Sequence, residues 1–116
     1  MKINSAIQLT AYERKQLLLV KEYVDVHLHE SLDPGELVLS FDISVYKFKA
    51  GFVQLCGRSF SEYLKWKRME KAMELLCNSN KINYEIAKEC GYKDTSAFVR
   101  AFRKWHGQTP DKVRKL

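Results

Sequence analysis

The chain has 116 residues, 46% of them hydrophobic and 29% charged, which suits one globular domain or two small subdomains sharing a helix and is too apolar for a disordered chain. No apolar run approaches the ~18 residues that cross a bilayer, and the first ten residues lack the apolar core of a signal peptide, so we expect a cytoplasmic protein without a membrane partner. The net charge of +6 gathers late, because residues 80–116 hold nine Lys/Arg against four Asp/Glu, whereas residues 1–40 hold four against six. This imbalance favours a polyanion as the partner.

Hydrophobic periodicity predicts helices and no strand, so the expected fold class is all-α with seven helices. In chain order they cover residues 10–30, 36–41, 45–56, 60–78, 84–90, 95–105 and a short stretch from 110. Helix-capping side chains mark their starts: Thr10 with Glu13, Ser44, Ser59 with Glu62, Asp94, and Thr109 before Pro110. Pro34 and Gly35 are interpreted as a break in the chain, and Gly57 and Gly107 as helix ends.

A two-helix unit occurs twice in the sequence. Residues 37–44 lie over 86–93, and residues 48–60 lie over 98–110. Each copy is a short helix, a tight turn and a longer helix whose apolar stripe ends in glycine. The stripes are Phe48, Phe52 and Leu55 in the first copy and Phe98, Phe102 and Trp105 in the second.

The second copy has the features of a helix-turn-helix. Ala87 is small where two short helices cross, and Gly91 supplies the positive φ of the turn. The outward face of the next helix offers hydroxyl, apolar and guanidinium groups that suit base edges in a major groove: Thr95, Ser96, Val99 and Arg100. Lys93, Arg103 and Lys104 flank this face as candidate phosphate contacts. A helical hairpin with Arg100 on a solvated face is the alternative. The repetition and the basic charge favour double-stranded DNA as the partner.

The helix over residues 60–78 bridges the two copies. At ~1.5 Å per residue it is about 27 Å long. Recognition helices that enter successive major grooves on one DNA face lie about 34 Å apart. A bridge of this length, with its flanking subdomains, has the size that such spacing requires.

The stretch "IAKECGYKDTSAFVRAFRKWHGQTP" at 86–110 resembles the C-terminal DNA-binding domain of the AraC/XylS family of transcription regulators, and "GRSFSEYLKWKRMEKAMELL" at 57–76 is similar to that family's first-repeat ending and linker helix. The resemblance covers residues 16–114. It implies a sequence-specific regulator in which one monomer reads two adjacent major-groove segments. The implied organisation is a short arm at 1–9, a first helix-turn-helix subdomain with the linker helix at 10–79, and a second at 80–116. Carried over by position, the base-facing residues are Tyr46, Lys49, Ala50, Thr95, Ser96, Val99 and Arg100, and Ser44 and Lys47 join the phosphate contacts.

The first copy departs from the family pattern. Val38 stands where the family has alanine, Asp42 stands at the turn glycine, and Gly51 lies inside the recognition helix at a cost of about 1 kcal/mol in helix propensity. We therefore expect the second unit to supply most of the sequence discrimination and the first to contribute phosphate contacts through Lys47 and Lys49. The alternative function is a helical protein-interaction module whose first helix-turn-helix is degenerate.

No residue set points to catalysis, a cofactor, a metal or a small-molecule effector in this chain. His27 and His29 are two apart on a helix and point in different directions. There is no Cys/His ligand spacing, glycine-rich phosphate loop or nucleophile elbow, so an enzyme is not expected. Cys56, Cys77 and Cys90 are interpreted as reduced, buried thiols, and Trp66 and Trp105 as core anchors.

The first helix has an acidic side that consists of Glu22, Asp25 and Glu30. RNA polymerase is a candidate partner for this side, although a solvated face is the favoured interpretation.

Overall fold

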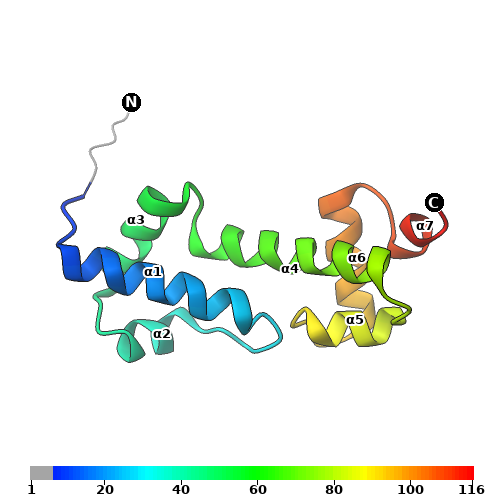
Figure 1. Cartoon of the computed structure of the whole chain (residues 1–116), viewed down its shortest axis with the longest axis horizontal. Helices are drawn as coiled ribbons and strands as arrows, with labels where there is room; N and C mark the ends of the chain where they lie inside the picture. The colour runs from blue at the N-terminus through cyan, green and yellow to red at the C-terminus, as the bar shows by residue number, and fades with distance from the viewer. Residues whose placement is uncertain (1–6) are drawn as a thin grey trace. The chain divides into compact units, whose positions relative to one another are not determined.

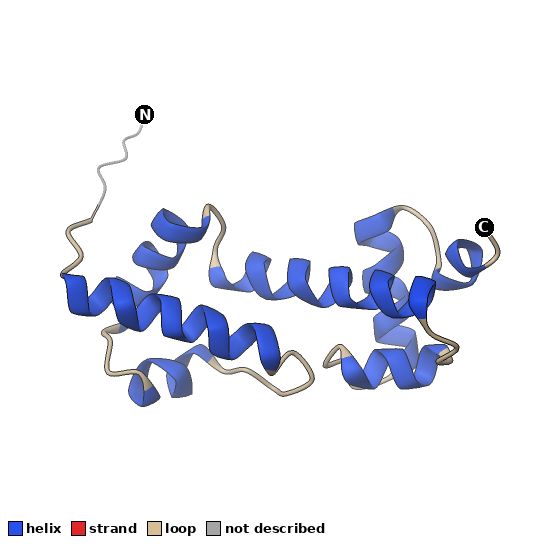
Figure 2. Cartoon of the chain, in the orientation of Figure 1, coloured by secondary structure: helices blue, strands red, loops and turns tan. Residues whose placement is uncertain are grey.

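The computed structural model describes residues 7–116, and within that range it contains seven α-helices and no strand (Figures 1 and 2). The helices are α1 (Ala11–Val26), α2 (Pro34–Ser40), α3 (Val45–Cys56), α4 (Phe60–Asn78), α5 (Asn83–Glu89), α6 (Thr95–His106) and α7 (Pro110–Arg114). The prediction of an all-α fold with seven helices is confirmed. No helix in this part of the chain has both the length and the apolar surface that crossing a membrane requires.

The chain divides into two compact units. Unit 1 takes the described residues up to His27 together with Leu32–Leu64, and unit 2 takes Leu28–Ser31 together with Lys65–Leu116. The division falls inside α4, so the first residues of this helix complete unit 1 and the remainder belongs to unit 2. The subdomains expected from the sequence, 10–79 and 80–116, instead meet beyond the end of α4, and as functional subdomains they remain a prediction.

The internal repeat is visible in the helices themselves. The helices α2 and α5 have 7 residues each, and α3 and α6 have 12 each. Gly57 and Gly107 end α3 and α6 in the left-handed conformation, with φ of 75° and 81°. The repeat also extends to the helix before each hairpin, since the buried positions of α1 have the same spacing as those of α4. These positions are Leu17, Val20 and Val24 in α1 and Met69, Ala72 and Leu76 in α4.

Aromatic rings fill the core of unit 1. Phe48 and Phe52 of α3 are each 1% exposed, and their ring centroids lie 5.2 and 5.5 Å from that of Phe60 at the start of α4. Tyr63 lies 5.3 Å from Phe52, and its hydroxyl donates a hydrogen bond to the carboxylate of Asp25. Burial of these large apolar surfaces holds α3 against the start of α4 through Phe48 and Phe52, two members of the stripe predicted from the sequence.

In unit 2, α6 packs on α4 and α5 through its own stripe. Phe98 and Phe102 are fully buried in a cluster with residues of α4 and α5. The ring of His106 adds a polar contact, with Nε2 3.2 Å from the backbone oxygen of Met69. The last position of each stripe is not buried, because Leu55 in α3 and Trp105 in α6 are both 37% exposed. The prediction of Trp105 as a core anchor is therefore wrong.

The first helix is shorter than predicted. It ends at Val26, where the His27 N–H still bonds to Val24 and the His27 ring Nδ1 lies 2.7 Å from the Tyr23 oxygen. The following backbone leaves the helical path, and the carbonyls of Leu28 and Glu30 accept hydrogen bonds from the side chain of Arg68. Glu30 thus lies outside α1, so the acidic face predicted on that helix loses one of its three members.

Other local predictions also need correction. The helix α2 begins at Pro34 rather than after it, because Asp33 caps the helix through its carboxylate and proline suits the first helical position. Cys77 is exposed, so its interpretation as a buried thiol is wrong, while Cys56 is half-buried and Trp66 is half-buried. Cys90 is buried as predicted, and this burial raises the pKa of its thiol to about 11, which keeps the thiol protonated and unreactive.

Candidate nucleic-acid interface

The turn between α5 and α6 requires its glycine for two reasons. Gly91 has φ of 85°, and the Tyr92 N–H reaches back to the Ala87 oxygen at 2.9 Å, which is the Schellman ending of a helix. A Cβ placed on Gly91 would lie 2.4 Å from the Leu28 carbonyl oxygen and 2.7 Å from a guanidinium nitrogen of Arg68. The predicted positive φ is confirmed, whereas the close approach of Leu28 was missed because it comes from a segment far away in the sequence.

The first unit builds the same turn with different residues. Among the described non-glycine residues, only Asp42 has a positive φ, 53°, and the Ile43 N–H reaches back to the Val38 oxygen at 3.1 Å. The Asp42 carboxylate also accepts a hydrogen bond of 2.9 Å from the Tyr12 hydroxyl, and this bond raises the pKa of Tyr12. Val38 and Asp42 therefore leave the helix-turn-helix backbone intact. Asp42 can occupy the turn because aspartate tolerates the left-handed region better than most residues.

Replacing Asp42 by alanine should destabilise unit 1 by about 1 kcal/mol through its backbone, because alanine adopts a positive φ less readily than aspartate does. Asp42→Gly should avoid that cost, and Tyr12→Phe removes only the hydroxyl contact. Urea unfolding followed by circular dichroism measures all three variants. Equal losses for Asp42→Ala and Asp42→Gly would place the effect in the Tyr12 contact and contradict a backbone origin.

In α6 the exposed face is the basic one. Its N-cap is Asp94, whose carboxylate accepts the Ala97 N–H at 2.7 Å. Of the predicted base-facing residues in this helix, Ser96 and Arg100 are exposed, and Thr95 and Val99 are half-buried. Val99 packs against the hydrophobic core of unit 2, so only part of its side chain is left for a ligand. The predicted phosphate contacts Lys93, Arg103 and Lys104 are all exposed.

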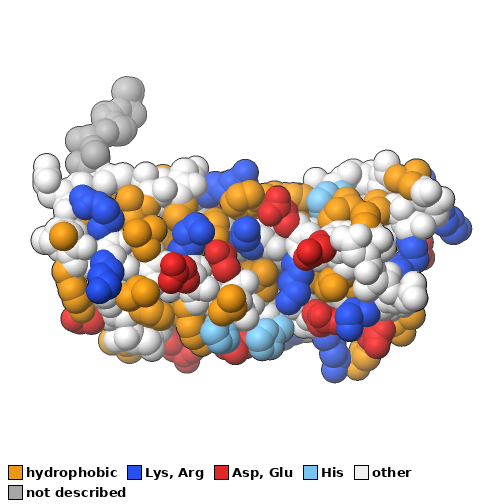
Figure 3. Space-filling model, in the orientation of Figure 1, with side chains coloured by type: hydrophobic (Ala, Val, Ile, Leu, Met, Phe, Trp, Pro, Cys, Tyr) orange, Lys and Arg blue, Asp and Glu red, His pale blue; other side chains and the backbone are white. Residues whose placement is uncertain are grey.

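The cations of this face are not used within the described chain. No hydrogen bond or ion pair to another residue of 7–116 engages the side chains of Arg100, Arg103 and Lys104. Arg100 and Arg103 are one turn apart, and α6 ends with several basic residues, which also suits the negative end of the helix dipole. The face shown in Figure 3 mixes basic, acidic and hydrophobic side chains.

In α3 the predicted residues are in two different situations. Tyr46 is 64% exposed and Lys49 is exposed, while Ala50 is half-buried. Ser44 is the N-cap, and its hydroxyl oxygen accepts the Lys47 N–H at 3.1 Å. The ammonium of Lys47, however, is 3.0 Å from Glu13 Oε1 and 2.8 Å from the Gln8 oxygen. This predicted phosphate contact is thus engaged inside unit 1.

Gly51 has a packing role that the sequence did not reveal. It is buried on the side of α3 that faces α1, and a Cβ there would lie 2.6 Å from a Leu17 methyl group and 3.4 Å from one of Leu9. The glycine lets the two helices approach closely, so packing against α1 accounts for its presence inside α3. Helix propensity alone cannot show this, because the constraint comes from α1.

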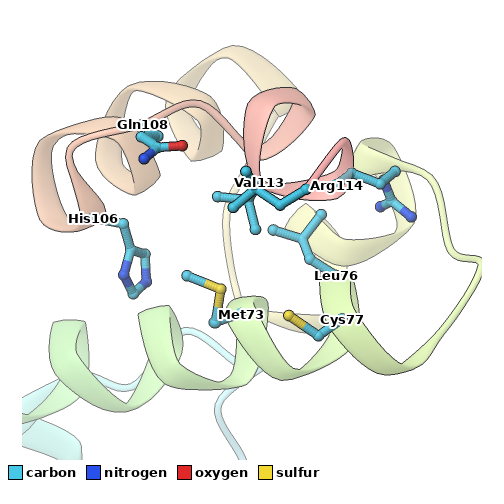
Figure 4. A pocket seen from close by; sticks show the side chains of 8 residues that line it. Met73, Leu76, Cys77, His106, Gln108, Val113 and Arg114 are labelled. Atoms are coloured by element: carbon cyan, nitrogen blue, oxygen red, sulfur yellow. The ribbon is translucent and has the colours of Figure 1, made fainter.

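A hollow of about 480 Å³ lies in unit 2 between α4, the α6–α7 connection and α7 (Figure 4). Its lining residues are Met73, Leu76, Cys77, His106, Gln108, Val113, Arg114 and Leu116. None of them is a predicted DNA contact. Within the described part of the chain, no group of three or more His, Cys, Asp or Glu side chains is arranged to hold a metal ion.

Comparison with known proteins agrees with this geometry. A family model described as a helix-turn-helix domain matches residues 37–116. The chain is 28% identical to the probable transcriptional regulator LumQ of Photobacterium leiognathi over 102 residues, 88% of this chain and 41% of LumQ. It is 32% identical to the regulatory protein PocR of Salmonella typhimurium over 93 residues, 80% of this chain and 31% of PocR. The chain thus spans less than half the length of these relatives.

Solved structures with the same architecture include two with substantial sequence identity. The DNA-binding domain of the global transcriptional factor AdpA, determined in complex with a target DNA, has a TM-score of 0.81 and 29% identity, covering 86% of this chain and 90% of that one. The C-terminal domain of the response regulator YesN from Fusobacterium nucleatum has a TM-score of 0.77 and 31% identity, covering 84% and 95%. The family match and the repeated helix-turn-helix show that this chain belongs to the AraC/XylS family of helix-turn-helix domains.

Proposed function

We propose that this chain is a sequence-specific DNA-binding transcription regulator, or the DNA-binding part of one, that acts without catalysis. The observation that carries the proposal is the exposed cationic face of α6 on a helix-turn-helix whose relative AdpA has been crystallised with a target DNA. Its affinity should come mainly from phosphate contacts and fall steeply with salt. A regulator of this kind works where the chromosome lies, which keeps the cytoplasm as the expected compartment.

We further propose that α6 supplies most of the base discrimination. Arg100, Arg103 and Lys104 of α6 align in the repeat with Ala50, Val53 and Gln54 of α3. At these three aligned positions α6 carries cations and α3 carries none. An arginine can also pair bidentately with guanine. Ser96 and the exposed part of Val99 would complete the contacts in the groove.

For the first unit we propose a smaller but real contribution. Its turn has the same hydrogen-bonded geometry as the second, so α3 is presented on an equivalent scaffold. Tyr46 and Lys49 project from its exposed side, and they suit a thymine methyl or a phosphate better than a bidentate base contact. One monomer would then read two adjacent major-groove segments, with the second unit dominant.

The rival proposal, a protein-interaction module with a degenerate helix-turn-helix, loses its structural motivation. It rested on the departures of the first unit from the family pattern, yet Asp42 holds the turn with a positive φ as Gly91 does. RNA polymerase remains a proposed partner without a defined surface, because Asp25 of the predicted acidic face is already paired with Lys21 at 3.4 Å. No effector is proposed.

The experiment that tests the function is an in-vitro selection from random duplex DNA with purified protein at about 0.1 M salt. Two enriched blocks about one helical turn apart would support two reading units. One short enriched block would mean that only the 84–107 unit reads bases. No enrichment, together with binding that disappears as salt rises, would contradict sequence-specific recognition.

Lys93→Ala should weaken binding to all duplexes alike, because an exposed lysine before the α6 cap is a phosphate contact in this proposal. The slope of log K against log salt should become shallower by about 0.9, the value of one lost contact. A salt titration on the selected duplex and on a scrambled one measures both quantities. A loss confined to the selected duplex would assign Lys93 to base recognition instead.

A further inference from the structure

A short stretch of chain before α1 lies against the recognition helix of unit 1. We call Ile7–Leu9 the arm segment. The Ile7 N–H donates to Gln54 Oε1 at 2.9 Å, and Gln54 Nε2 donates back to the Ile7 oxygen at 3.3 Å. A side-chain amide that meets both polar groups of one backbone residue holds that residue as a strand neighbour would. The arm segment is thereby fixed to the last turn of α3.

The rest of the arm segment runs along one face of α3. Lys47, Gly51 and Gln54 are spaced so that they share a helix face. A Cβ on Gly51 would be in contact with both methyl groups of Leu9, at 3.4 and 3.5 Å. Because Gly51 has no side chain, the arm segment can lie directly on the α3 backbone there. Lys47 contacts Gln8, Gly51 contacts Leu9 and Gln54 contacts Ile7.

The contact at the start of this face neutralises a cation. Lys47 Nζ donates to the Gln8 oxygen at 2.8 Å and to Glu13 Oε1 at 3.0 Å, and the Lys47 side chain is only 27% exposed. The same carboxylate oxygen accepts the Thr10 N–H at 2.9 Å in the capping box of α1. The hydrogen bond from Thr10 and the proximity of Lys47 both lower the pKa of Glu13, so this carboxylate is charged at neutral pH.

We propose that the arm segment and Glu13 form an autoinhibitory latch, which holds the Lys47 ammonium away from DNA until the chain before α1 is displaced. The inference rests on the proposed function, in which the first turn of α3 lies near a DNA phosphate. Moving the arm segment removes the Gln8 oxygen and, through Thr10, loosens the Glu13 carboxylate. Anything attached ahead of α1 would thus act on the DNA affinity of unit 1 through residues 7–10.

Unit 2 has no counterpart of this latch. The positions that align with Lys47, Gly51 and Gln54 are Ala97, Ala101 and Lys104. No described carboxylate pairs with Lys104, so α6 is ready for DNA while α3 is restrained. Only unit 1 is joined directly to the chain before α1. A contact made by that chain can therefore reach the DNA-binding surface of unit 1 through the arm segment.

The decisive variant is Glu13→Gln, since glutamine can still complete the capping box while the charge that pairs with Lys47 is removed. On a random-sequence 30-base-pair duplex we expect the slope of log K against log salt to steepen by about 0.9, and binding at 0.1 M salt to tighten about fivefold to tenfold, as one more phosphate contact predicts. Glu62→Gln is the matched control, because it removes the same charge from the Ser59 capping box.

The double variant Glu13→Gln/Lys47→Gln should lose this gain. A gain that persists without Lys47, or one no larger than that of Glu62→Gln, would overturn the latch. Gln54→Ala reaches the same contact by another route and should speed hydrogen exchange at the Ile7 amide; unchanged exchange there would overturn the seating of the arm segment. If the wild-type chain binds no duplex at all, the proposed function fails, whereas wild-type binding with an unchanged Glu13→Gln slope defeats only the latch.

Discussion

Replacing Gly91 by alanine is expected to destabilise unit 2 by about 4 kcal/mol, which combines a positive-φ penalty, overpacking and the disturbance of charged hydrogen bonds. The new Cβ would lie 2.4 Å from the Leu28 carbonyl oxygen, a backbone atom that cannot rotate away as a side chain can. It would also push on Arg68, which donates to the oxygens of Leu28 and Glu30. Such a loss corresponds to a fall in melting temperature of roughly 15–25 °C for a domain of this size.

Gly107→Ala provides the matched control. Gly107 has nearly the same backbone conformation, φ of 81°, but a Cβ there would meet nothing within 4 Å. Its replacement should therefore cost only about 1 kcal/mol, the conformational part of the Gly91 effect. Thermal unfolding followed by circular dichroism gives both values, and hydrogen exchange at the Tyr92 amide locates the loss. Equal destabilisation by the two variants would mean that the Leu28 and Arg68 contacts near Gly91 contribute nothing.

Helix starts were predictable from the sequence because their determinants are local. Ser44, Asp94 and Thr109 each accept a hydrogen bond from the backbone N–H three residues further on. Donor and acceptor are therefore both present in the same short stretch of sequence. The predicted bounds of α3 and α4 are confirmed, and the start of α6 at Thr95 is confirmed as well. Asp33 gives the same signal before Pro34, and interpreting the proline only as a helix breaker hides that signal.

The features that escaped prediction depend on distant partners. Nothing near residue 26 shows that α1 ends there, because the carbonyls that leave the helix are bonded by Arg68, forty positions away for Leu28. Gly51 looks like a weak point of α3 until Leu17 and Leu9 are placed beside it. Lys47 looks like a solvated cation until Glu13 is placed beside it. In each case the sequence supplies the residue and only the packing supplies its role.

The exposure of the candidate contacts on α6 was easier to predict, because a helix-turn-helix determines which side of its second helix is exposed. The buried stripe of Phe98 and Phe102 leaves Ser96 and Arg100 outside by helical geometry alone. Val99 was less predictable, because a residue beside the stripe can pack inward, and here it partly does. The assignment of bases to these side chains stays a prediction.

Arg100→Ala should reduce discrimination at one base position by about 1–3 kcal/mol, which is about fivefold to 150-fold in relative affinity. The reason is that Arg100 is exposed in the second turn of α6, where it is held by no other described residue and can present two donors to a guanine. Binding of the selected duplex and of single-base variants of its site, measured by fluorescence anisotropy at a fixed salt concentration, gives the effect position by position.

Two further variants separate base reading from charge. Arg100→Lys keeps the positive charge but loses the planar fork, so its affinity for random DNA should stay near that of the wild type while preference at the same base is reduced. Arg103→Ala, one turn later on the same helix, should weaken all duplexes alike. If Arg100→Ala behaved as Arg103→Ala is expected to, with the same loss on every sequence, Arg100 would be a phosphate contact, and discrimination by α6 would have to rest on Ser96 and Val99.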